Sequence, residues 1–77
     1  MFPALGQGGS RLDRIKVGMR LLALRGSKTR EEVAYFTKLT VKSLESYERG
    51  YRMPVDSAKM KLARYYGVTV DSIFYAE

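Results

Sequence analysis

Few residue types in this chain of 77 residues are able to do chemistry, because it contains no His and no Cys. Without them the commonest general base, the commonest nucleophile and base pairs and nearly all transition-metal sites are excluded. Asp, Glu, Lys, Tyr and Ser remain as reactive types. We therefore expect no enzyme, no metal, no cofactor and no small-molecule ligand, and helix packing must stabilise the chain without disulfides.

The charged residues form the second chemically informative pattern. Lys and Arg number 14, Asp and Glu number 8, and the formal net charge is +6. Residues 1–30 carry seven basic side chains and one acidic side chain, so the whole excess lies there. A basic excess favours a polyanionic partner such as a nucleic acid or an acidic membrane surface, although many small basic domains bind neither.

Helix boundary signals indicate the elements that must position these side chains. Potential N-terminal caps are Ser10, Thr29, Thr40, Asp56 or Ser57, and Thr69. Ser10 and Thr29 are each followed three residues later by an acid, which is the pattern of a capping box. The predicted helices cover residues 11–25, 30–37, 41–49, 56 or 57 to 67, and 69–75. The predicted fold class is all-α, and residues 1–10 are expected to be a flexible N-terminal arm or a non-native remnant.

The helices predicted at 30–37 and 41–49 are separated by a very short turn that contains Lys38 and Leu39. Such a pair is typical of a helix-turn-helix, in which the second helix enters the DNA major groove and the first lies across the backbone. The apolar residues spaced to meet in one core are Val33, Ala34, Leu39, Leu44 and Tyr47. Small all-α domains with other roles contain such pairs too, so helix spacing alone leaves both interpretations open.

Three stretches, in order, carry a resemblance to a known family. They are Thr-Arg-Glu-Glu-Val-Ala (29–34), Ser-Leu-Glu-Ser-Tyr-Glu-Arg-Gly-Tyr-Arg-Met-Pro (43–54) and Leu-Ala-Arg-Tyr-Tyr-Gly-Val-Thr-Val-Asp-Ser-Ile-Phe (62–74). These resemble S-Q-E-E-L-A, T-I-S-R-I-E-R-G-K-R-x-P and L-A-K-A-L-G-V-S-L-D-E-L-F of the XRE (Cro/CI-like) helix-turn-helix family of phages and mobile elements. The resemblance implies a compact five-helix, lambda-repressor-like DNA-binding domain at 11–77, with the helix-turn-helix at about 29–50.

The resemblance also implies roles for individual residues. The side chains that would face the bases are Val41, Lys42, Ser43 and Ser46. Those that would contact phosphates are Lys28, Thr29, Arg30, Thr40, Arg49, Tyr51 and Arg52. Arg25 and Glu48 match a pair that in the family links the first helix to the end of the recognition helix. Because no Arg, Asn or Gln stands at the base-facing positions, we expect sequence readout to be modest.

Three positions depart from the family's pattern. Lys38 stands where a glycine with positive φ is usual, so the turn either bears left-handed strain or closes differently. Thr37 replaces a leucine, and we expect Phe36 to supply the missing packing. Glu45 places a negative charge on the recognition helix itself, which is compatible with DNA if it faces cytosine or points away from the groove.

The first predicted helix has two apolar faces. The face expected in the core consists of Val17, Leu21 and Leu24, and the opposite face of Leu12, Ile15, Met19 and Leu22. The second face would be covered by Phe2 and Leu5 or by the last helix, or would bind protein. We hypothesise a homodimer formed through this face or through Val70, Phe74 and Tyr75.

The expected function is sequence-specific binding of double-stranded DNA by a transcriptional repressor or regulator that occupies an operator. The alternative is a protein-interaction module of the same fold, antirepressor-like or antitoxin-like, with weak or no specific DNA binding. Glu45 and the second apolar face favour this alternative. No apolar run approaches the roughly 18 residues of a membrane-spanning helix, and residues 1–10 lack a signal-peptide core, so we expect a cytoplasmic protein.

Overall fold

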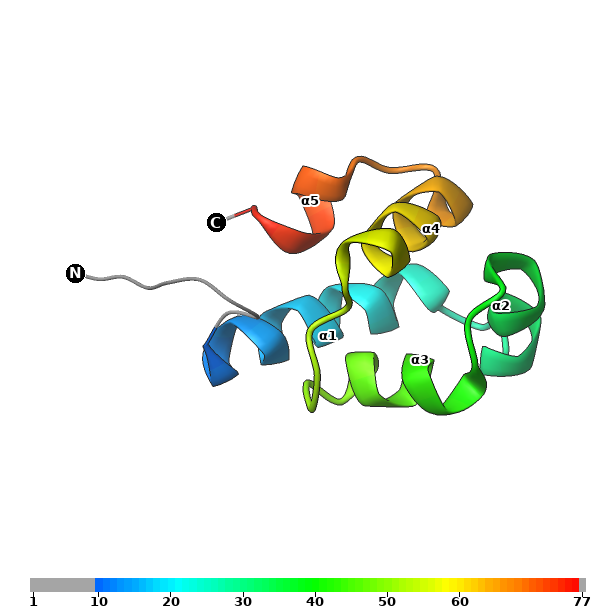
Figure 1. The fold of residues 1–77 in the computed structure, drawn as a ribbon, viewed down its shortest axis with the longest axis horizontal. Helices are drawn as coiled ribbons and strands as arrows, with labels where there is room; N and C mark the ends of the chain where they lie inside the picture. The colour runs from blue at the N-terminus through cyan, green and yellow to red at the C-terminus, as the bar shows by residue number, and fades with distance from the viewer. Residues whose placement is uncertain (1–9, 77) are drawn as a thin grey trace.

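Five helices make up the computed structural model, which describes residues 10–76. They are α1 (Arg11–Arg25), α2 (Arg30–Thr37), α3 (Val41–Glu48), α4 (Asp56–Tyr66) and α5 (Val70–Phe74). In Figure 1, α3 lies below α1, α4 and α5 lie above it, and α2 closes the right-hand end. The predicted all-α class with five helices is confirmed. Within the described residues no helix is long and apolar enough to cross a membrane. The arm predicted for residues 1–10 lies, except for Ser10, outside the described residues.

Hydroxyl caps begin four of the helices. Ser10 and Asp13 form the predicted reciprocal capping box at the start of α1, with N···O distances of 3.1 and 3.4 Å. Side-chain oxygens of three threonines cap the later helices α2, α3 and α5: these are Thr29, Thr40 and Thr69. Each such bond satisfies a backbone N–H that has no partner within its own helix.

The predicted cap of α4 is wrong. Asp56 is the first residue inside the helix, and Val55 occupies the cap position without a side-chain bond. The helix begins early because the carbonyl of Val55 already accepts the N–H of Lys59 at 2.9 Å. In the first turn, the carboxylate of Asp56 interacts favourably with the positive end of the helix dipole.

All five helices contribute to one core. Its buried apolar residues are Val17, Leu21, Val33, Leu44, Tyr47, Ala58, Leu62, Ala63, Ile73 and Phe74. The predicted core face of α1 is therefore correct, and the partly buried Leu24 packs against the same cluster. The predicted core of the α2 and α3 pair is also correct, since Ala34 and Leu39 pack against this cluster.

Gly18 allows α1 and α3 to pack unusually closely. A Cβ atom added at this position would clash with the backbone carbonyl oxygen of Glu48 and would lie 2.8 Å from that of Tyr47. Both carbonyls are backbone atoms in the last turn of α3 and cannot move aside as the end of a flexible side chain could. Only glycine therefore leaves room for the end of α3 to lie on α1.

The turn between α2 and α3 is closed by a left-handed lysine. Lys38 adopts φ 64° and ψ 22°, so of the two expected alternatives the turn bears left-handed strain. A non-glycine residue in this region costs about 1 kcal/mol or more. The hydroxyl of Thr37 supports the turn by accepting the N–H of Leu39 at 3.3 Å.

The expected role of Phe36 in the core is wrong. Phe36 is 60% exposed, whereas Thr37 is only 4% exposed and occupies the buried position itself. Its hydroxyl donates to the carbonyl of Val33 at 2.7 Å, so burial leaves no unsatisfied polar group. Helix periodicity explains the result, because a neighbouring residue points about 100° away and cannot replace the inward-facing side chain.

We predict that Gly18→Ala destabilises the fold by about 2 kcal/mol, because the added methyl forces α3 away from α1. Helix propensity alone has the opposite sign and would stabilise the variant by up to about 1 kcal/mol. Urea unfolding of the purified chain measures the difference, and Ala23→Gly at an exposed position of α1 measures the propensity contribution. A Gly18→Ala variant more stable than the wild type would contradict the close packing.

Candidate nucleic-acid interface

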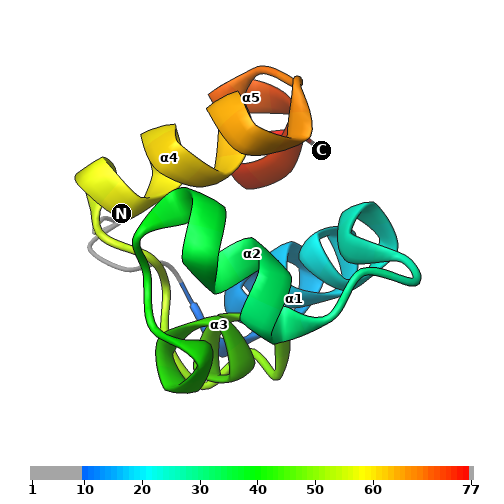
Figure 2. The same cartoon turned by 90° about the vertical axis from the view of Figure 1, so that its right-hand side faces the viewer.

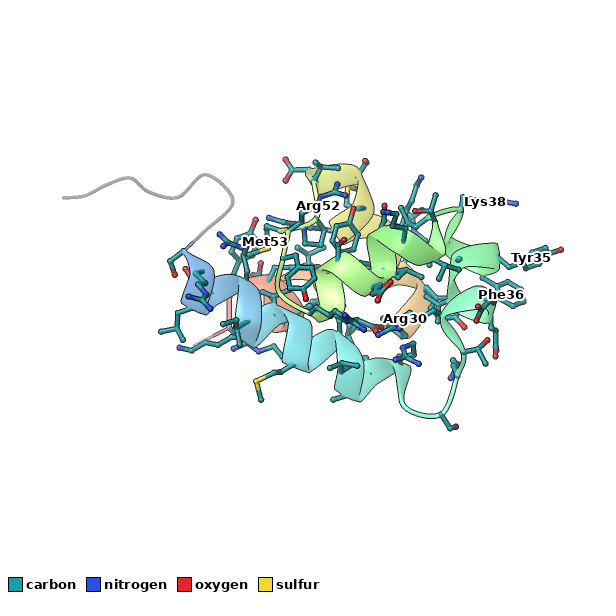
Figure 3. The ribbon with its side chains drawn as sticks, turned by 90° about the horizontal axis from the view of Figure 1, so that it is seen from below. Arg30, Tyr35, Phe36, Lys38, Arg52 and Met53 are labelled. Atoms are coloured by element: carbon teal, nitrogen blue, oxygen red, sulfur yellow. The ribbon has the colours of Figure 1, made fainter. Side chains whose placement is uncertain are left out.

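The predicted base-facing residues lie on one short helix whose two ends are held by the rest of the fold. Figure 3 looks at the molecule from the side of α3, with Lys38 near the N-terminal end of this helix and Arg52 near the other. Lys42 is exposed on α3, and three side chains that are partly accessible accompany it: Val41, Ser43 and Ser46. The structure therefore brings the four predicted residues together on α3, with one cation among them.

The most constrained side chain near this surface is Glu48 at the end of α3. Its side chain is only 2% exposed. One carboxylate oxygen accepts from Nε of Arg25 on α1 at 2.8 Å, and the other accepts from Nε of Arg30 on α2 at 2.9 Å. The predicted ion pair between Arg25 and Glu48 is present, and the sequence patterns did not predict the second arginine. Both oxygens of a nearly buried carboxylate are thus satisfied by charge-assisted hydrogen bonds.

Arg25 also organises the loop that leads into α2. Its Nη1 donates to the carbonyl of Lys28 at 2.7 Å, while its Nε remains bound to Glu48. The hydrogen bond with Glu48 is the largest cause that raises the pKa of Arg25 above its usual value. One guanidinium therefore links the loop before α2 to the end of α3.

The phosphate role predicted for Arg30 competes with this internal bond. Arg30 keeps 27% of its side chain exposed, but its Nε is bound to Glu48. Figure 3 shows Arg30 between α3 and α1 rather than extended into solvent. Its remaining guanidinium nitrogens are the groups that a phosphate would have to use.

The second acid on α3 is also paired. Glu45 lies 3.0 Å from a terminal nitrogen of Arg49, one helical turn later. A side-chain hydrogen bond with Tyr51, followed by the charge of Glu45, raises the pKa of Arg49. The negative charge expected on the recognition helix is therefore balanced locally, and Arg49 extends from the same helix end.

The remaining predicted phosphate contacts surround α3 and the start of α2. Lys28, Tyr51 and Arg52 are exposed, and the guanidinium of Arg52 lies 5.5 Å from the centre of the Tyr47 ring. The hydroxyls of Thr29 and Thr40 act as helix caps. A hydroxyl that accepts an N–H keeps its own O–H as a donor, so capping leaves both threonines able to bond to a phosphate oxygen.

Some of the basic side chains make hydrogen bonds within the fold and are not free to bind a partner. Arg20 donates through its two terminal nitrogens to the carbonyls of Ile73 at 2.8 Å and Ala76 at 2.9 Å, and so holds the C-terminal segment on α1. Arg14 donates to the carbonyl of Gly50 at 3.3 Å. With Arg25 and Arg30 bound to Glu48, four basic side chains of the N-terminal segment make internal hydrogen bonds. Net charge therefore overstates how much of this segment is available to a polyanion.

The second apolar face of α1 is exposed in the described structure. Its members have exposed fractions of 38–63%: Leu12, Ile15, Met19 and Leu22. The last helix does not cover them, so that expectation is wrong, and Phe2 and Leu5 lie outside the described residues. The alternative dimer surface at the C-terminus cannot include Phe74, because this side chain is 8% exposed and belongs to the core.

We predict that Glu48→Gln lowers the free energy of unfolding by about 2–4 kcal/mol, because it leaves two partly buried arginines without their counter-charge. Chemical denaturation measures the loss. Glu45→Gln on the same helix is the matched control, since its ion pair is exposed and is worth at most about 1 kcal/mol. Equal effects of the two substitutions would contradict a structural role for the buried carboxylate.

We predict that the partly buried phenol of Tyr66 makes the fold less stable at alkaline pH. Burial, followed by the charge of Glu48, raises the pKa of its phenol from 10.0 to about 12. The folded state therefore holds this proton more tightly than the unfolded chain, so the contribution of Tyr66 to the free energy of unfolding should be constant below about pH 9 and fall as the pH rises from about 10 to 12. Urea unfolding across this range should give a shallower decline for Tyr66→Phe than for the wild type. Parallel curves would contradict the prediction.

Neither a metal site nor a related protein adds to this description. Within residues 10–76 no group of three or more potential metal-ligating side chains is present. Comparison with models of protein families, with curated proteins and with solved structures found no match. The features of this chain that bear on function are therefore the geometry of α2 and α3 and the motifs that they carry.

Proposed function

We propose that this chain binds double-stranded DNA with sequence preference and regulates transcription, most simply as a repressor that occupies an operator. In this proposal α2 and α3 act as a helix-turn-helix, with α3 in the major groove and α2 across the backbone. The observation that supports this proposal is the way in which α3 is anchored and its charges are paired. Its end is anchored through Gly18 and Glu48, both of its acids are paired internally, and its accessible face presents hydroxyls and Lys42.

The pairing of the two acids is important because DNA is a polyanion. An unpaired carboxylate on α3 would be repelled by phosphates and would lose hydration in the groove. Glu48 is buried between Arg25 and Arg30, and Glu45 is bound to Arg49. α3 is thus able to approach DNA without an uncompensated negative charge.

The proposed base contacts are modest in number. Lys42 would donate to guanine O6 or N7, and Val41 would contact a thymine methyl group. Ser43 and Ser46 would bond to several bases and discriminate weakly. Backbone contacts would then supply most of the affinity, through Lys28, Thr29, Thr40, Arg49, Tyr51 and Arg52, with Arg30 contributing only through nitrogens not bound to Glu48.

A second candidate function is supported by the exposed apolar face of α1. Four adjacent apolar side chains on one helix form a typical protein-binding surface. If this face is the principal functional surface, the chain is a protein-interaction module, antirepressor-like or antitoxin-like. If both surfaces function, the α1 face joins two copies of a DNA-binding chain, which would read half-sites about 34 Å apart.

DNA binding is tested by a salt series with duplex DNA. The logarithm of the affinity should fall steeply with the logarithm of salt concentration, by about 0.9 for each phosphate contact. Lys28→Ala should reduce this slope by about 1, whereas Lys61→Ala, on the exposed surface of α4, should leave it unchanged. A slope near zero would contradict the proposal and favour the interaction module.

Dimerisation through α1 is tested by analytical ultracentrifugation at tens of micromolar protein. We expect a dimer for the wild type and a monomer for Met19→Glu, because a charge at the centre of an apolar interface is costly to bury. Met60→Glu, an exposed methionine on α4, is the control and should remain dimeric. A wild-type monomer would exclude the interface.

A further inference from the structure

A second surface lies between α2 and α4. The side chains Phe36, Thr37, Lys38, Lys61, Arg64 and Tyr65 line a shallow groove of about 370 Å³, mainly apolar on its exposed lining. Figure 2 looks onto this side of the molecule, with α2 in front, α4 above it and α3 below. The groove is lined by side chains of α2, α4 and the turn after α2, so it uses residues other than those of the accessible face of α3. We call it the aromatic groove.

The aromatic groove belongs to a continuous run of four rings. Tyr35 contacts Phe36 edge to face at 5.0 Å between centroids, Phe36 stacks on Tyr65 at 6.0 Å, and Tyr65 contacts Tyr66 at 5.1 Å. Tyr35 is 71% exposed and Phe36 60% exposed. In Figure 3 both side chains project away from the helices at one end of the molecule. Because the core position of this turn of α2 is filled by Thr37, packing of the fold does not explain these exposed rings.

The charges around the aromatic groove have one sign. Lys38, Lys61 and Arg64 line it, and no acidic side chain does. None of these three cations forms an ion pair with another residue in the part of the chain that the structure describes. Three other basic side chains differ from them, since Arg25 and Arg30 are bound to Glu48 and Arg49 is bound to Glu45. An apolar floor with unpaired cations at its rim is complementary to an acidic segment that carries apolar anchors.

We infer that the aromatic groove binds an acidic, amphipathic segment of a partner protein. One or two apolar side chains of that segment pack against Phe36 and Tyr65, and its carboxylates pair with Lys61, Arg64 and Lys38. Single-stranded nucleic acid fits less well, because bases stack on rings with free faces whereas Phe36 and Tyr65 stack on each other. A second copy of this chain fits less well too, because its net charge of +6 would repel these cations. The inference does not depend on DNA binding by α3.

Selection from a random peptide display library on the immobilised full chain tests the inference. Enriched peptides should combine Asp or Glu with Leu, Ile, Phe or Trp. A synthetic copy of an enriched peptide should bind at least tenfold more weakly to Phe36→Ala, and to the double variant Lys61→Glu, Arg64→Glu, than to the wild type. These positions are exposed, so circular dichroism should show folded variants, and Met60→Ala, at an exposed position of α4 outside the groove lining, should bind as the wild type does.

Four outcomes would overturn the inference. They are the absence of enriched peptides, enrichment of peptides without acids, binding that the groove variants do not weaken, and tighter binding of oligothymidylate at the same residues. Duplex DNA affinity measured on Phe36→Ala separates this surface from α3. We expect it to stay within about twofold of the wild type, whereas failure of the DNA proposal would leave the peptide result unchanged.

Discussion

The buried carboxylate of Glu48 is the interaction on which the arrangement of the other elements depends. It ends α3, and its two oxygens bind Arg25 of α1 and Arg30 of α2, so three helices meet at one charged group. The backbone of the same residue rests on Gly18, where no side chain separates α3 from α1. A carboxylate removed from water is costly unless its partners are fixed. The position of α3 is therefore set by polar geometry at its end, in addition to apolar contacts along its length.

Because several arginines make internal hydrogen bonds, the net charge of the chain is a poor measure of the positive charge available to a partner. Arg14, Arg20, Arg25 and Arg30 make internal hydrogen bonds, although by composition they appear as part of one basic surface. Six other basic side chains lie at the two surfaces proposed for partners, and of these Arg49 is paired with Glu45. Lys42, Arg49 and Arg52 surround the accessible face of α3, and Lys38, Lys61 and Arg64 line the aromatic groove. We propose that the first group serves DNA and the second an acidic protein segment.

Local signals were sufficient to predict the elements, because helix caps and turns depend on neighbouring residues. Ser10 and Thr40 cap as expected, Thr29 caps α2 without the reciprocal Glu32 bond of the predicted capping box, and apolar spacing correctly placed Val33 and Leu44 in the core. Interactions between distant residues were harder to predict. The contact of Gly18 with α3 and the second arginine at Glu48 depend on how helices cross, which no spacing encodes. For Phe36 the error was different, since the expected rotation of α2 does not occur and Thr37, bonded to the carbonyl of Val33, fills the buried position itself.

In the proposed function, an anchored, locally neutral α3 reads DNA through Lys42. In-vitro selection from random duplex DNA, carried out in parallel with the wild type and Lys42→Ala, tests it most directly. We expect an enriched sequence for the wild type, and the same sequence relaxed at one or two positions for the variant, with a loss of discrimination below the roughly 1–3 kcal/mol of a bidentate contact. The absence of any enriched sequence, or identical enriched sequences for both proteins, would contradict it.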